Sequence, residues 1–286
     1  MNIRRIATVL LAAAIPAFAQ SPADGEQTLA VGAATRTYRL HVPAGAPSTP
    51  LALVVVFHGG GGNARNAARM SGMDAKADKE KFIVVYPNGS GPMSGAFLTW
   101  NTWQCCGYAL DNHVDDIAFI RAMVEDIART HAIDRRRVFA TGMSNGGMMA
   151  YRVGCEMADV FAAIAPVAGA LDTDSCKPSG PVSLIAFHGK ADEHVRFDGG
   201  VPIKSVDRRH ARVDKPVSYA IDFWKRANRC DEAPARDQKG NVTHEAYACG
   251  ATSTAVELYA FDGQGHSWPG SATDLMWDFF SRHPRK

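Results

Sequence analysis

The sequence predicts an α/β fold in which helices cover both faces of a mostly parallel central sheet. Apolar runs alternate with segments of helical periodicity along most of the chain, as in β-strands joined by crossover helices. The run 51–57 is almost continuously apolar and rich in valine, which is typical of a strand buried on both faces. The segment 114–131 has one apolar helical face, formed by Ile117, Ile120, Met123, Val124 and Ile127.

The other elements follow in chain order. Strands are expected at 37–42, 82–86, 137–141, 161–167, 182–187 and 256–261, and helices at 63–79, 145–152, 217–227 and 272–282. Two segments have neither pattern: 88–112 is a long loop rich in Gly, Trp and Cys, and 231–248 is polar, with too few apolar residues to pack by itself. No repeat or linker divides the chain, so we expect a single domain.

The N-terminus has the pattern of a secretory signal peptide. Arg4 and Arg5 precede an apolar, alanine-rich segment that ends in Ala17-Phe18-Ala19, a small-x-small sequence typical of a cleavage site. We expect cleavage after Ala19, with 1–19 as the signal peptide and 20–286 as the single folded domain. The apolar run is short for a membrane span. The protein is therefore expected to be secreted or periplasmic, without a membrane partner.

Charge and cysteine content narrow the classes of partner. A net charge of +2 gives no electrostatic reason to expect nucleic acid, and a monomer is expected. No Cys-x-x-Cys or paired His/Cys spacing suggests zinc, so neither a metal nor a cofactor is expected.

Six cysteines in an exported chain favour disulfide bonds. We expect Cys155–Cys176 and Cys230–Cys249, because each pair brackets a segment that a cross-link would constrain. That leaves the neighbours Cys105–Cys106, whose bond needs a distorted turn. Alternatively, one of these two bonds to another cysteine.

The strongest motif is Gly142-Met143-Ser144-Asn145-Gly146. An expected strand runs into it and an expected helix runs out of it, which is the setting of a nucleophile elbow in the α/β-hydrolase fold. Ser144 is therefore the candidate nucleophile. An ordinary Gly-Ser turn is the alternative.

The glycine run after the first buried strand suits an oxyanion hole. In His58-Gly59-Gly60-Gly61-Gly62, backbone amides can point at a developing negative charge without obstruction by side chains. We expect the amides of Gly60 and Asn145 to be the donors, and His58 to support the loop. A phosphate-binding loop is the alternative, but the Lys-Ser/Thr that follows such a loop is missing.

Acid and base candidates follow the nucleophile in the order usual for this fold. Asp192 lies just past the end of an expected strand, whereas its rivals Asp172 and Asp174 lie farther from one. His266 lies in a glycine-rich loop after the last strand and is the candidate base. The histidines set aside as base are His188, His194, His210, His244 and His283.

These pieces together resemble the family that unites polyhydroxybutyrate depolymerases and bacterial feruloyl esterases of the carbohydrate-esterase type. The matching segments span most of the chain: 58–64, 105–107, 114–120, 142–147, 161–169, 188–192 and 265–270. The resemblance implies an α/β-hydrolase fold, an ester substrate, and Ser144, Asp192 and His266 as nucleophile, acid and base.

The substrate is less determined than the reaction. Feruloyl or acetyl esters of plant polysaccharide are expected, with Trp103 and Trp268 as candidate stacking residues for a ring. Core packing is the alternative role for both. A short 3-hydroxybutyrate ester or polymer is the alternative substrate. A non-catalytic relative that only binds carbohydrate or polymer is the alternative of another class, but the trio of residues is complete.

Overall fold

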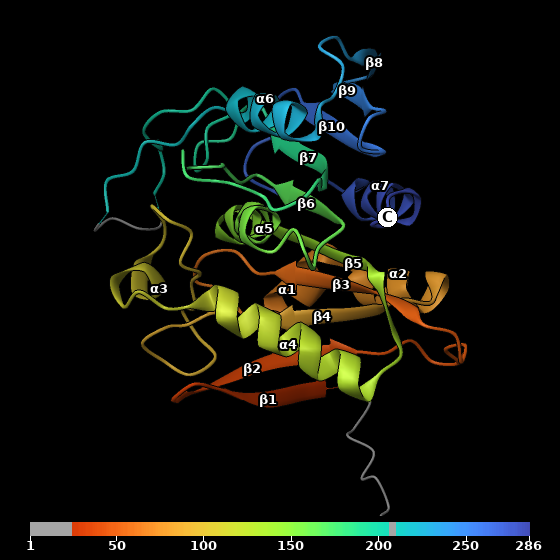
Figure 1. The fold of residues 1–286 in the computed structure, drawn as a ribbon. Helices are drawn as coiled ribbons and strands as arrows, with labels where there is room; N and C mark the ends of the chain where they lie inside the picture. The colour runs from red at the N-terminus through yellow and green to blue at the C-terminus, as the bar shows by residue number, and fades with distance from the viewer. Residues whose placement is uncertain (1–24, 206–209) are drawn as a thin grey trace, which may run out of the picture.

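The computed structural model describes residues 25–205 and 210–286, so the expected signal peptide, 1–19, lies outside the described residues. Within them, ten strands form one sheet in the order β1-β2-β4-β3-β5-β6-β7-β10-β9-β8 (Figure 1). The strands are β1 (Gly25–Val31), β2 (Ala34–His41), β3 (Leu51–Phe57), β4 (Ile83–Pro87), β5 (Ile133–Met143), β6 (Ala163–Val167), β7 (Ser183–Gly189), β8 (Ala235–Lys239), β9 (Val242–Cys249) and β10 (Thr254–Phe261).

The middle of the sheet is parallel, which confirms the predicted fold class. Strands β4, β3, β5, β6, β7 and β10 pair with their neighbours in parallel. At the two edges, β1 and β2 and then β9 and β8 add antiparallel strands. Because the six middle strands run the same way, their carboxyl ends meet at one edge of the sheet, where α/β folds place their sites.

Helices cover both faces of the sheet (Figure 1). Helices α1 (Ala64–Ser71), α2 (Met73–Glu80) and α7 (Ala272–Arg282) lie on one face, and α4 (Asp116–Thr130), α5 (Asn145–Glu156) and α6 (Val217–Asn228) on the other. Along β3, Leu53, Val55 and Phe57 pack towards α4 and α5, while Val54 and Val56 pack towards α1 and α2. This alternation explains why β3 is apolar at every position.

The expected single helix at 63–79 is wrong. Gly72 ends α1 with a φ of 59° and its amide donates to the Ala68 carbonyl, after which α2 begins at Met73. A glycine in this left-handed conformation is a common helix terminator. Gly72 itself is the sequence signal for this break.

Four elements were not foreseen. The polar stretch 231–248 forms β8 and most of β9, which extend the sheet beyond β10. Every residue of β8 is exposed, because a strand at the edge of a sheet can pair its backbone without burying a face. At the opposite edge, β1 precedes the first expected strand, and within the expected loop 88–112 lies the short helix α3 (Gly107–Asp111).

Three disulfides cross-link the described chain. Cys155 at the end of α5 is joined to Cys176 in the segment before β7, and Cys230 after α6 is joined to Cys249 at the end of β9. Cys105 is joined to its neighbour Cys106, just before α3.

A buried ion pair fastens the segment 88–101 to the rest of the fold. Asp116, at the start of α4, has a fully buried side chain that accepts from Arg36 Nη2 at 2.8 Å and from the Asn101 amide at 2.9 Å. Arg36 also donates to the Asn88 carbonyl and lies over the Phe119 ring. Burial raises the pKa of Asp116, against the lowering effect of Arg36.

Removal of Asp116 tests this attachment. Asp116→Ala leaves the Arg36 guanidinium buried without a counter-charge, so we expect a loss of about 3–5 kcal/mol in the free energy of unfolding, measured by urea denaturation. The control is Asp159→Ala, which breaks the exposed Arg121–Asp159 pair and should cost less than about 1 kcal/mol. Equal losses in the two variants would contradict the attachment.

Candidate active site

Ser144 lies on a sharp turn between β5 and α5. Its backbone has a φ of 60° and a ψ of −124°, a conformation that residues other than glycine rarely adopt and that is typical of functional sites. The Ser144 amide donates to the Val167 carbonyl at 2.9 Å. A Cβ atom at Gly146 would overlap the carbonyl oxygens of Phe57 and His58. The turn is therefore packed directly against the end of β3, at the carboxyl edge of the sheet.

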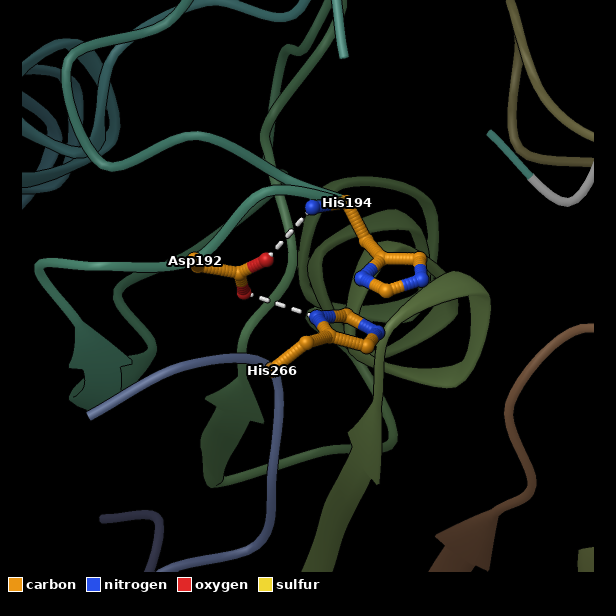
Figure 2. A group of neighbouring side chains, drawn as sticks. All are labelled: Asp192, His194 and His266. Carbon is orange, nitrogen blue, oxygen red and sulfur yellow. Dashed lines mark hydrogen bonds and ion pairs between the residues drawn. The ribbon is translucent and has the colours of Figure 1, made fainter. Parts of the chain in front are cut away.

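Asp192 follows β7 at the same edge and has a fully buried side chain. Its Oδ1 accepts from the His194 amide at 2.8 Å, and its Oδ2 accepts from His266 Nδ1 at 2.7 Å (Figure 2). The Val195 amide also donates to Oδ1, at 3.0 Å. The His188 Nε2 atom lies 3.5 Å from Oδ2. Burial raises the pKa of Asp192, but the bonds from His188, His266 and Val195 outweigh it and hold that pKa well below its usual range. Asp192 is therefore an ionised acceptor.

His266 comes from the loop between β10 and α7. Because ionised Asp192 accepts from Nδ1, the proton of a neutral His266 lies on Nδ1 and leaves Nε2 as an acceptor. The His194 ring stacks on the His266 ring with centroids 4.7 Å apart (Figure 2). Among the described residues, no hydrogen bond joins Ser144 Oγ to His266. The structure thus brings His266 and Asp192 together, whereas Ser144 Oγ is not hydrogen-bonded to His266.

The glycine loop lies beside Ser144. A Cβ at Gly59 would come within 3.5 Å of Ser144 Cβ. The amides of Gly61 and Gly62 donate to the carbonyls of Leu98 and Gly59. Within the described ranges, the Gly60 amide has no such partner. The amide of Asn145, in the first turn of α5, also has no intrahelical acceptor.

His58 connects this loop to the segment after β4. Its Nδ1 donates to the Gly59 carbonyl at 2.8 Å, and its Nε2 accepts from the Gly89 amide at 3.0 Å. The Trp100 ring lies against it, and the Trp100 indole donates to its carbonyl. Burial lowers the pKa of His58 to about 4. His58 is therefore a neutral structural link.

The Asn145 side chain has a role that sequence analysis missed. Its Oδ1 accepts from the Trp100 amide at 2.8 Å, and its Nδ2 donates to the Trp100 carbonyl at 3.0 Å. The side chain thus attaches the segment 88–112 to the nucleophile turn. No sequence signal distinguishes this role of the Asn145 side chain from the role expected for its backbone amide.

Ser144 lines a narrow cavity of about 10 Å³, room for about one water molecule. Its other lining residues are Cys105, Cys106, Asn145, Met148, His194, Lys204 and Arg212. Sequence analysis did not foresee Lys204 and Arg212, because their position depends on the path of the long segment after Asp192. A larger hollow of about 260 Å³ lies between α6 and β9–β10, and neither Ser144, Asp192 nor His266 lines it.

The two tryptophans expected at the substrate have other surroundings. Trp103 lies under the Arg152 guanidinium and beside the Cys155–Cys176 disulfide. Trp268 donates from its indole nitrogen to Thr273 Oγ1 at 3.1 Å and packs against the core beneath α7. Neither side chain lines the pocket at Ser144.

One group of side chains in the described chain is compact enough to hold a cation. Ligand atoms of Asp192, His194 and His266 lie within 4.8 Å of one another. The hydrogen bond between Asp192 and His266 already uses one atom of each, so a cation there would compete with it. Among the described helices, none is both long and apolar enough to cross a membrane.

Known proteins with similar sequences are esterases, in agreement with the geometry of the site. Residues 36–213 match the family described as esterase PHB depolymerase. A putative esterase, NocK, of Nocardia uniformis subsp. tsuyamanensis is 31% identical over 263 residues, covering 84% of this chain and 72% of its own. Feruloyl esterase C of Emericella nidulans is 30% identical over 278 residues, covering 92% and 91%.

A solved structure shares the fold. The acetyl xylan esterase from Aspergillus awamori superposes with a TM-score of 0.65 at 18% identity, covering 90% of this chain and 99% of its own. The family match extends over more than half of the chain, and the two relatives match along most of their own length. The chain therefore belongs to the esterase PHB depolymerase family and is a carboxylic ester hydrolase of the α/β-hydrolase fold.

Proposed function

We propose that the protein is an exported serine esterase in which Ser144 is the nucleophile, His266 the general base and Asp192 the acid that orients it. The observation that carries the proposal is the 2.7 Å hydrogen bond between His266 Nδ1 and Asp192 Oδ2, at the sheet edge that also bears the strained Ser144 turn. The bond fixes the tautomer whose Nε2 can accept a proton.

The reaction follows from these atoms. Ser144 Oγ attacks the ester carbonyl while His266 Nε2 takes its proton, and Asp192 stabilises the imidazolium that forms. His266 then gives the proton to the leaving alkoxide, and water resolves the acyl-enzyme. The bond between Ser144 and His266 forms as the ester binds, since catalytic hydrogen bonds are often long in free enzymes.

The proposed oxyanion hole consists of the amides of Gly60 and Asn145. Support comes from the neighbouring amides, because those of Gly61 and Gly62 already donate to other carbonyls. Two fixed backbone donors stabilise the negative charge of the tetrahedral intermediate without reorganisation during the reaction. No metal or cofactor takes part in the proposed steps.

For the substrate, we favour feruloyl or acetyl esters of plant polysaccharide. Support comes from the relative named feruloyl esterase C, which matches over 91% of its length. Esters of poly- or oligo-3-hydroxybutyrate are the second candidate, supported by the family description. Hydrolysis rates on methyl ferulate, acetylated xylan and hydroxybutyrate oligomers separate the two, since each candidate predicts a different preferred ester.

Trp103 and Trp268 lie outside the pocket at Ser144. In this proposal they contact only the part of a polymeric substrate that extends beyond the pocket. The pocket lining suggests that Cys105, Cys106 and Met148 meet the group bound to the scissile ester. We propose that the protein is a monomer. The signal peptide 1–19 directs its export to the periplasm or the medium. A purely binding role for polysaccharide is the candidate of another class, and hydrolysis of a nitrophenyl ester excludes it.

Ser144→Ala tests the nucleophile. Without the hydroxyl no acyl-enzyme forms, so kcat for 4-nitrophenyl acetate should fall on the order of 10⁴-fold or more, with the unfolding curve unchanged. The matched control is the exposed Ser179→Ala, which should keep full activity. Substantial residual turnover in Ser144→Ala, or loss of wild-type activity on chelation, would refute the mechanism.

Asp192→Asn tests the acid against its rival from the sequence. The amide no longer selects the tautomer with a proton on Nδ1, so kcat should fall by roughly 10³–10⁴-fold. Asp174→Asn changes an exposed carboxylate that pairs with Lys215 and should leave kcat unchanged. A similar loss in both variants would mean that Asp192 has no special part in the reaction.

His58 predicts a pH dependence of stability. Its folded-state pKa is lowered to about 4, while an unfolded histidine titrates near pH 6.5. Between these values only the unfolded chain binds the proton, so stability falls as pH falls through this window. At pH 5 the loss due to His58 should be about 2 kcal/mol relative to pH 7.5.

The measurement is urea denaturation at pH 7.5 and 5.0 for wild type and His58→Gln. Other histidines titrate in both proteins, so the informative quantity is the stability difference between them, which should shrink by about 2 kcal/mol at pH 5. His131→Gln, at a half-buried histidine, is the control and should show a smaller change. A constant difference would show that His58 is not held neutral.

A further inference from the structure

Arg212 is nearly buried, with 7% of its side chain exposed, and lines the pocket that contains Ser144. The Asp214 carboxylate holds it through Nε at 2.5 Å and Nη2 at 3.1 Å, and Nη2 also donates to the His194 carbonyl at 2.7 Å. Asp214 is fully buried and exchanges backbone hydrogen bonds with Gly200. The guanidinium is therefore fixed in orientation.

One nitrogen of Arg212 lacks a strong acceptor. A guanidinium has five N–H donors, and the contacts to Asp214 and His194 use those on Nε and Nη2. In the described chain, Nη1 meets only the Cys105 sulfur, at 3.9 Å, and sulfur is a weak acceptor. Two N–H groups on Nη1 are thus left for an oxygen in the pocket. A purely structural role explains Nε and Nη2 but not Nη1.

The charged side chains on the described pocket lining beside Arg212 are cations. Burial and the neighbouring Asp214 carboxylate raise the pKa of Asp172 to about 8, so near neutral pH Asp214 is the one carboxylate of this pair that balances the guanidinium. Lys204 is a second cation on the pocket lining, and it forms an exposed ion pair with Glu193. The described lining holds these two cations and no carboxylate.

We propose that Arg212 anchors the substrate by donating from Nη1 to a free carboxylate carried by the ester, a few bonds from the scissile carbonyl. The inference rests on the proposed esterase function and narrows its substrate class to carboxylate-bearing esters. A guanidinium is suited to carboxylates because it offers directed, charge-assisted donors. Arg212 also donates to the backbone carbonyl of His194, and the His194 ring stacks on the ring of His266.

The test compares esters that differ only in that carboxylate. The first pair is the linear dimer of 3-hydroxybutyrate and its terminal amide, where the charge lies on the alcohol side. The second pair is 4-nitrophenyl hydrogen glutarate and 4-nitrophenyl pentanoate, where it lies on the acyl side. Wild type should prefer the acid of at least one pair by about tenfold in kcat/KM, mainly through KM.

The variant is Arg212→Met combined with Asp214→Asn, because the single change would leave the Asp214 charge buried without a partner. In this variant the acid should lose more kcat/KM than the neutral ester does, so the preference for the acid should fall to within about twofold. The control is Arg121→Met with Asp159→Asn, an exposed pair, which should keep the preference. A structural role for Arg212 would instead slow both esters of a pair equally.

Two outcomes overturn the proposal: a wild type without preference for either acid, or a preference that survives in the Arg212 and Asp214 variant. Failure of the esterase function looks different, because then neither the acid nor the neutral ester is hydrolysed. A binding measurement separates the cases further. Calorimetry on Ser144→Ala with the hydroxybutyrate dimer should show affinity that is about tenfold weaker when Arg212→Met and Asp214→Asn are added.

Discussion

The strained, positive-φ backbone at Ser144 is the constraint on which the rest of the site depends. Such a conformation costs about 1–3 kcal/mol and persists only where the surroundings enforce it. Here α5 is buried on nearly all sides, the Ser144 amide is bonded to the end of β6, and Gly146 lies against the end of β3. The parallel core thus holds the turn in place, and the turn holds the serine at the sheet edge.

Neutral polar groups attach the loops to that turn. The Asn145 amide side chain pairs with the Trp100 backbone, and His58 joins Gly59 to Gly89. The low pKa of His58 keeps this link uncharged through the neutral range. A neutral His58 avoids the cost of a buried charge without a counter-charge at this link.

The parts that sequence predicted well are those specified locally. β3 and the turn at Ser144 depend on a run of apolar residues and on glycines within a few positions, and their boundaries were nearly correct. β8 was missed because an exposed edge strand needs no apolar face. Trp103 is close to the motifs along the chain, yet its ring packs beside Arg152. Lys204 and Arg212 reach the pocket through contacts between distant segments, which no local pattern encodes.

The two candidate acids, Asp172 and Asp192, differ in their electrostatic surroundings, which the sequence does not reveal. Asp172 and Asp192 are both buried carboxyls near the sheet edge, but their pKa values move in opposite directions. Asp192 accepts from two backbone amides and from His266, whereas Asp172 receives the Lys215 amide and faces the Asp214 carboxylate.

A carboxylate can stabilise an imidazolium only while it is ionised at the pH of the reaction. Donors surrounding Asp192 keep it ionised despite its burial, and a like charge beside Asp172 favours its protonated form. The arrangement of donors, more than the distance of each acid from a strand end, therefore makes Asp192 the carboxylate suited to orient His266. The same arrangement leaves Asp214 as the partner that fixes Arg212 at the pocket.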